Sequence, residues 1–91
     1  MKNYQLEVFT RPTCSDCQDL KGFLQHYKIP HKEYDLAKDP EKEKDLKNIT
    51  GNRIVPTLLF SRPSFFGKSK STSMIGFERN KSEIMKLLNI K

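Results

Sequence analysis

The sequence predicts one mixed α/β domain spanning residues 1–91, with its elements in the order β-α-β-α-β-β-α. Apolar residues make up 35% of the chain and gather in short runs. Some runs follow the two-residue repeat of strands and others the repeat of helices. Proline and glycine separate several of these runs, as expected between regular elements. The pattern is typical of a compact domain and not of a disordered chain.

The first strand is expected to end near Thr10, because Leu6 and Val8 alternate with polar residues. A helix then starts at a cysteine pair, and residues 18–27 show the helical pattern. Its apolar stripe consists of Cys17, Leu20, Leu24 and Tyr27. The strand and the helix therefore meet at the cysteines.

Residues 31–35 are predicted to form a short second strand. The second helix is predicted over residues 41–50. Asp39 is a suitable capping side chain for it, and Pro40 suits the first helical position. Gly51 is expected to close this helix.

The apolar run of residues 54–60 predicts a buried strand with Pro56 at its entrance, where a missing N–H does least harm. A further strand is expected over residues 71–75. Asn80 and Glu83 have the spacing of a capping box before the last helix. The apolar face of that helix consists of Ile84, Leu87 and Leu88.

The net charge of +6 is concentrated in the C-terminal third. No aromatic-basic motif or recognition helix accompanies this charge, so the sequence favours a basic rim that steers an acidic protein partner and predicts no nucleic-acid binding. No run approaches the roughly 20 apolar residues of a membrane span, and the N-terminus lacks a leader-like apolar region. A cytoplasmic, monomeric protein that does not bind membranes is expected. Between positions 62 and 81, the residues that carry the basic excess are Arg62, Lys68, Lys70, Arg79 and Lys81.

Cys14 and Cys17 are the only cysteines, and they stand at the start of the first predicted helix. A thiol there lies near amide N–H groups and the positive end of the helix dipole, which stabilise its thiolate. The thiolate is the nucleophile in disulfide exchange. Half of a zinc site, a structural disulfide and redox-inert core residues remain alternatives at this point, although zinc usually needs four ligands and no second pair exists at finger spacing.

Three segments in order, residues 8–17, 50–57 and 75–77, resemble the glutaredoxins of the thioredoxin-fold superfamily. They match that family's strand with its dithiol, its proline loop and its glycine turn. The resemblance covers nearly the whole chain. It implies a thioredoxin-like fold, in which a four-stranded mixed sheet is flanked by helices and the three segments meet on one surface.

The resemblance also implies roles. Cys14 would attack the substrate disulfide and Cys17 would resolve the mixed disulfide. The backbone of Val55, before a Pro56 implied to be cis, would pair with the substrate like a strand. Arg11, where the family usually has lysine, would bind a substrate carboxylate and stabilise the thiolate. The expected substrate-binding residues are Arg11, Thr13, Ser15, Asp16, Val55, Pro56, Gly76 and Phe77.

The chain departs from the family pattern in three places. Ser15 and Asp16 replace the usual Pro-Tyr, and the carboxylate opposes ionisation of the neighbouring thiol. Gly76 is followed by Phe77 where the family has a second glycine, which favours thioredoxin reductase over glutathione as the electron donor. Residues 61–73 contain an insertion that is interpreted either as a hairpin extension without a ligand or as a partner-binding lobe.

The sequence therefore predicts an enzyme, a glutaredoxin-like thiol–disulfide oxidoreductase that reduces protein or mixed disulfides. Its partners would be disulfide-containing proteins and an electron donor, either thioredoxin reductase or a small thiol such as glutathione. No cofactor or metal is expected. One alternative is a redox-sensing interaction protein similar to the C-x-x-C transcription regulators of arsenate-reductase type. The other is a glutaredoxin dimer bridged by an iron–sulfur cluster.

Overall fold

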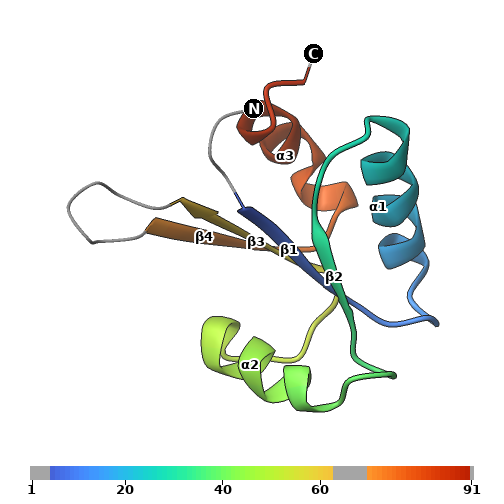
Figure 1. Ribbon diagram of the computed structural model, residues 1–91, viewed down its shortest axis with the longest axis vertical. Helices are drawn as coiled ribbons and strands as arrows, with labels where there is room; N and C mark the ends of the chain where they lie inside the picture. The colour runs from blue at the N-terminus through green and yellow to red at the C-terminus, as the bar shows by residue number, and fades with distance from the viewer. Residues whose placement is uncertain (1–4, 63–69, 91) are drawn as a thin grey trace.

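The computed structural model describes residues 5–62 and 70–90. Its sheet consists of β1 (Gln5–Thr10), β2 (Lys32–Asp35), β3 (Thr57–Arg62) and β4 (Lys70–Ile75). The helices are α1 (Ser15–His26), α2 (Glu41–Thr50) and α3 (Lys81–Leu87), with a 3-10 turn η1 (Glu78–Asn80) before α3. The strand order is β2-β1-β3-β4, with β1 parallel to β2 and the other neighbours antiparallel. The predicted four-stranded mixed sheet flanked by helices, a thioredoxin-like fold, is confirmed (Figure 1).

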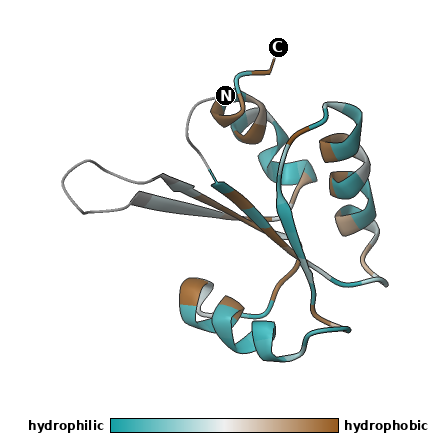
Figure 2. Ribbon diagram, viewed as in Figure 1, coloured by the Kyte–Doolittle hydropathy of each residue, from teal (hydrophilic) through white to brown (hydrophobic). Residues whose placement is uncertain are grey.

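The sheet separates two apolar layers (Figures 1 and 2). Helices α1 and α3 cover one face and α2 covers part of the other. Side chains alternate between the faces along β1, so Leu6 and Val8 enter the larger core while Phe9 enters the smaller one. Tyr27, predicted as part of the helical stripe, is 42% exposed because the helix has already ended at His26. The larger core comprises Leu6, Val8, Leu20, Leu24, Leu58, Phe60, Phe77, Ile84 and Leu88, and the smaller one Phe9, Leu36 and Leu46.

Helix α2 has its predicted bounds. Gly51 ends it with a φ of 81°, a left-handed conformation that glycine adopts without steric cost, and donates its N–H to the Lys47 oxygen at 2.7 Å. The predicted cap at Asp39 is wrong, because Pro40 is the N-cap and no side chain bonds to the first turn. Asp39 belongs to the preceding turn, where its N–H donates to the Asp35 oxygen at 2.9 Å.

The predicted capping box at Asn80 is also wrong. Asn80 is the N-cap of α3, but its side chain does not bond to the helix. The side-chain amide instead donates to the backbone oxygens of Ile75 at 2.7 Å and Gly76 at 3.0 Å. The reason is local: η1 intervenes before α3 and brings Asn80 back against the turn at Gly76.

The third strand begins at Thr57 and not at residue 54, since Pro56 has no N–H to give to the ladder. The β3–β4 pair is longer than predicted and stays in register out to Arg62 opposite Lys70. Part of the supposed insertion is therefore paired strand. The centre of the insertion, with Phe65 and Phe66, lies outside the described residues.

Candidate active site

Cys14 is the N-cap of α1, and its sulfur accepts the N–H of Cys17 at 3.1 Å. The Cys14 N–H donates to the Arg11 oxygen at 3.2 Å, which closes the turn that leads from β1 into the helix. Both cysteines are free thiols. Cys14 is partly exposed, whereas Cys17, one turn further along the helix, is fully buried. An exposed thiol backed by a buried one is the arrangement that attack followed by resolution needs.

Burial raises the pKa of the Cys17 thiol from 9.0 to about 12, and its hydrogen bond with Cys14 acts in the same direction. The unfolded chain releases this proton near pH 9, while the folded chain keeps it until about pH 12. The stability that comes from the protonated thiol is therefore complete below pH 9 and is lost as the pH rises toward 12.

We expect the free energy of unfolding to fall more steeply above pH 9 in the wild type than in a Cys17→Ala variant, because only the wild type carries this raised pKa. Urea unfolding at a series of pH values measures the difference. Tyr34, whose pKa is also raised, is present in both proteins and cancels in the comparison. Identical pH profiles would contradict the assignment.

The peptide bond between Val55 and Pro56 is cis, as the resemblance implied. The Cys14 thiol donates to the Val55 oxygen, with 3.8 Å between sulfur and oxygen. The Val55 N–H has no hydrogen-bond partner among the described residues. The Pro56 oxygen accepts the N–H of Gly76 at 2.7 Å, so the proline loop and the glycine turn are joined directly beside Cys14.

Gly76 is required at its position. Its φ is +94°, and an added Cβ would lie 2.7 Å from Cδ and 2.9 Å from Cγ of Arg79. The Phe77 ring that follows is buried in the larger core, 5.1 Å from the ring of Phe23. The Phe77 side chain is therefore part of the core, and only the backbone of Phe77 is available to the site.

Asp16 joins the dithiol motif to the glycine turn. Its carboxylate accepts the N–H of Phe77 at 2.8 Å and the N–H of Glu78 at 3.2 Å. The sequence indicated that this carboxylate opposes ionisation of Cys14. The structure shows that two amide donors already offset part of its charge.

Arg11 pairs with Glu43 of α2 through a partly buried ion pair and hydrogen bond. The predicted carboxylate-binding guanidinium thus already holds a carboxylate of the chain itself. Thr13 and Ser15 are exposed on either side of Cys14 and have no side-chain hydrogen bond to a described residue. Of the predicted residues, Val55 and Cys17 contact the Cys14 sulfur. Pro56 is linked to Gly76, and Asp16 to the backbone of Phe77.

Sequence reasoning missed Glu43 and Ile54. Ile54 is 54% exposed although it directly precedes the Val55 backbone. An apolar side chain beside the proline loop is a signal in the sequence that could have indicated a contact surface. Glu43 gives no such signal, because nothing in an acidic helix turn identifies a partner 32 residues away.

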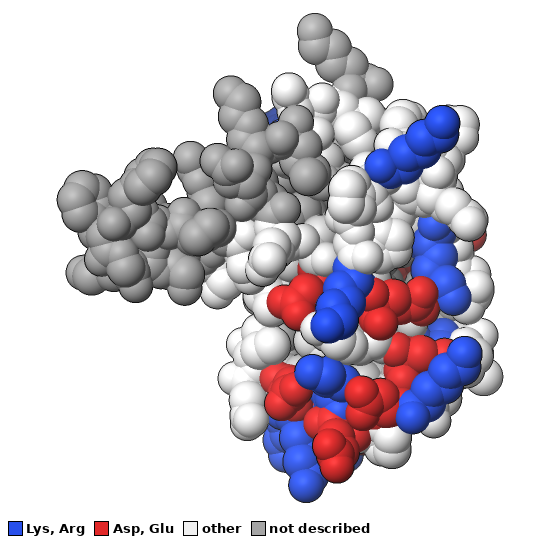
Figure 3. All heavy atoms as spheres, in the orientation of Figure 1, with Lys and Arg blue, Asp and Glu red and all other residues white. Residues whose placement is uncertain are grey.

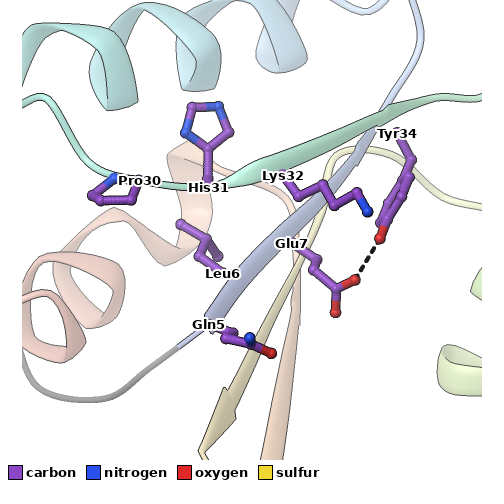
Figure 4. Close-up of a pocket in the computed structure, with 7 residues that line it drawn as sticks. All are labelled: Gln5, Leu6, Glu7, Pro30, His31, Lys32 and Tyr34. Atoms are coloured by element: carbon purple, nitrogen blue, oxygen red, sulfur yellow. Dashed lines mark hydrogen bonds between the residues drawn. The ribbon is translucent and has the colours of Figure 1, made fainter.

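A hollow of about 370 Å³ lies at the other end of β1, between that strand and β2 (Figure 4). The Tyr34 hydroxyl donates there to Glu7 at 2.6 Å, which raises the pKa of Tyr34 to about 12. Lys32 lies 5.6 Å from the centre of the Tyr34 ring. The hollow shares no residue with the dithiol surface, so it is not part of this site.

Acidic and basic side chains alternate on the face shown in Figure 3, and no large patch of one sign is visible there among the described residues. The side chains of Arg62, Lys68 and Lys70 lie outside the described part, and the predicted basic rim stays a prediction. Within the described ranges, no three His, Cys, Asp or Glu side chains are placed to hold a metal ion. In the same ranges, no helix has the length and apolar character to cross a membrane.

Comparison with known proteins agrees with this geometry. The glutaredoxin family model matches residues 6–62, which include the dithiol and the proline loop. The chain belongs to the glutaredoxin family. The crystal structure of a mutant of the thioredoxin-like protein BC3987 superposes over all of both chains, with a TM-score of 0.71 and 26% identity. Plasmodium falciparum thioredoxin shares the fold at a TM-score of 0.67 and 15% identity, covering 91% of this chain and 68% of that one.

A curated relative of a different kind also matches this glutaredoxin. The global transcriptional regulator Spx of Enterococcus faecalis is 34% identical over 44 residues. The match covers 48% of this chain and 33% of the regulator, so the chain spans about a third of that relative's length. Family membership and the adjacent cysteines support a thiol–disulfide oxidoreductase type of function.

Proposed function

We propose that this glutaredoxin is a dithiol enzyme that reduces disulfide bonds in other proteins. The observation that carries the proposal is the position of the Cys14 sulfur. It is partly exposed, accepts the Cys17 N–H and lies 3.8 Å from the Val55 oxygen. An extended substrate segment can pair with the Val55 backbone while its disulfide meets Cys14.

The reaction consists of two exchanges. The Cys14 thiolate attacks one substrate sulfur, the substrate S–S bond breaks, and the other substrate sulfur leaves as a thiolate that takes up a proton. The Cys17 thiol then loses its proton and attacks the Cys14 sulfur. This releases the second substrate thiol and forms the disulfide between Cys14 and Cys17. Two electrons pass to the substrate. An external dithiol or thiol donor then supplies two electrons that reduce the disulfide between Cys14 and Cys17.

Burial of Cys17 fits the order of these steps. With its pKa raised to about 12, Cys17 stays protonated at neutral pH and does not compete with Cys14 for the incoming disulfide. The same burial makes resolution depend on proton loss once Cys14 is tied up in the mixed disulfide. We therefore expect attack to be fast and resolution slow in the catalytic cycle.

A coupled assay on a protein disulfide such as that of insulin tests the proposal. We expect turnover with thioredoxin reductase and NADPH, and at least tenfold slower turnover with glutathione and glutathione reductase, because the family's second glycine is absent at Phe77. Thioredoxin reductase without this protein is the control. No turnover with either donor would contradict the enzymatic proposal, and faster turnover with glutathione would contradict the choice of donor.

The match to Spx favours a second candidate, a redox sensor that changes its partners when the dithiol oxidises. In a sensor the dithiol needs to be oxidised only once, whereas in an enzyme it must be reduced again after each turnover. Stoichiometric oxidation without turnover in the same assay would favour the sensor.

A further inference from the structure

Hydrogen bonds join the dithiol turn, the proline loop and the glycine turn into a ring. The Cys14 thiol links the dithiol turn to the proline loop, with its sulfur 3.8 Å from the Val55 oxygen. The Pro56 oxygen links that loop to the glycine turn by accepting the Gly76 N–H at 2.7 Å. The Asp16 carboxylate closes the ring, since it accepts two N–H groups of the glycine turn at 2.8 Å and 3.2 Å. Each segment is therefore held from two sides.

The link between Cys14 and Val55 depends on the proton of the Cys14 thiol. The thiol donates that proton, and the Val55 oxygen can only accept. A thiolate has no proton to donate, and its negative charge is repelled by the carbonyl oxygen. The sulfur of a mixed disulfide has no proton either. This link therefore opens at the steps in which the sulfur has to stay beside the Val55 backbone.

The link through Asp16 does not depend on the state of the thiol. Its donors are backbone amides, which keep their protons throughout the exchange, and its acceptor is ionised, which strengthens both hydrogen bonds. Asp16 stands two residues after Cys14, in the first turn of α1. It therefore holds the part of the helix that carries the reacting sulfur.

The glycine turn is a firm anchor for this carboxylate. Its Gly76 oxygen accepts the side-chain amide of Asn80 at 3.0 Å. The Phe77 ring is 3% exposed and lies 5.1 Å from the ring of Phe23 on α1. A Cβ added at Gly76 would be 4.0 Å from Oδ2 of Asp16, so the carboxylate lies close against the turn. Because the same turn is bonded to the proline loop, it fixes the dithiol turn relative to that loop.

We propose that Asp16 is a positioning residue, which keeps the Cys14 sulfur beside the Val55 backbone while the sulfur carries no proton. The reaction that depends on it is attack on a disulfide in an extended protein segment, since such a segment pairs with that backbone and a small reagent does not. This inference rests on the proposed function and names the residue that aligns its first exchange. The Asp16 carboxylate acts through the glycine turn and takes no part in the exchange itself.

Two reactions of Cys14 separate alignment from ionisation. Attack on the symmetric disulfide of a neutral cysteine peptide needs the thiolate and pairing with Val55, whereas alkylation by iodoacetamide needs the thiolate alone. Both rate constants are measured at one pH in a Cys17→Ser background, so that a single exchange occurs. Their ratio, exchange over alkylation, cancels the fraction of thiolate. We expect the ratio to fall about tenfold when Asp16→Ala is added, because the sulfur is then no longer held beside the backbone.

Asp19→Ala is the matched control. It removes the same charge from the same helix, and Asp19 is exposed and has no partner among the described residues. We expect its ratio to stay within about twofold of wild type, since an exposed charge is screened. Asp16→Asn keeps one acceptor oxygen and should lower the ratio less than Asp16→Ala does. The proposal is overturned by an unchanged ratio in Asp16→Ala, by an equal fall in Asp19→Ala, or by an equal fall in Asp16→Asn.

Hydrogen exchange of the Phe77 and Glu78 amides supplies a readout that needs no enzymatic activity. In Cys17→Ser with Cys14 capped as its S-methyl disulfide, the sulfur has no proton. We expect both amides to keep the protection that they have beside the free thiol, and to lose it at least about tenfold when Asp16→Ala is added. Loss on capping alone, or full protection without Asp16, would overturn the proposal. The expected protection and rate ratio in a chain that turns over with neither electron donor would support the role of Asp16 and contradict the enzymatic proposal.

Discussion

Replacing Cys14 by serine is expected to lower the rate of protein disulfide reduction at least about 1,000-fold, to the uncatalysed background. A serine hydroxyl does not ionise near neutral pH and cannot form the mixed disulfide, so the first exchange is lost and not merely slowed. The fold should survive, because Cys14 is only partly buried and its replacement is nearly isosteric. Turnover in the coupled assay measures the loss, with thermal unfolding as the check on folding.

Cys17→Ser is the matched control for that result. It keeps the attacking thiol and removes the resolving one, so we expect the reaction to stop after one exchange with the substrate still bound to Cys14. Mass spectrometry would detect the adduct. Activity retained in Cys14→Ser, or an adduct absent from Cys17→Ser, would contradict the assigned roles.

Replacing Leu20 by alanine is expected to lower the free energy of unfolding by about 2–5 kcal/mol. Leu20 lies one turn after Cys17 on α1, and its fully buried side chain belongs to the larger core. Its removal leaves a cavity between the helix and the sheet. A typical domain has about 5–15 kcal/mol of stability in total, so this single change is a large fraction.

Urea unfolding measures the effect as a lower midpoint with an unchanged slope. Leu20→Met is the control, because it keeps the volume and should cost less than about 1.5 kcal/mol. A loss below about 1 kcal/mol in Leu20→Ala would show that Leu20 is not held in a tightly packed core.

Local patterns predicted the elements of this fold well. The bounds of α2 followed from a polar helical run closed by Gly51, because a glycine with positive φ is a strong local stop signal. Leu20 and Leu24 were correctly placed in the core because helical periodicity directly reports the buried face. The cis bond before Pro56 came from the family resemblance, since composition alone does not distinguish it from a trans bond.

Hydrogen bonds between distant side chains could not be predicted in this way. The capping patterns at Asp39 and Asn80 were present in the sequence, but tertiary contacts gave both residues other partners. The same is true of Asp16, whose carboxylate accepts from amides 61 and 62 residues away. Around the site, the sequence indicated candidate residues, and the fold gave Arg11 and Asp16 partners within the chain that no local pattern predicts.

The central claim is that Cys14 attacks a disulfide whose chain pairs with the backbone of Val55. Hydrogen exchange of the Val55 amide, measured by NMR in Cys17→Ser before and after it forms a mixed disulfide with a neutral cysteine peptide, tests this claim most directly. The claim predicts that the Val55 N–H, which has no partner among the described residues, becomes protected at least about tenfold in the adduct. A mixed disulfide that forms while this amide exchanges at its original rate would contradict it.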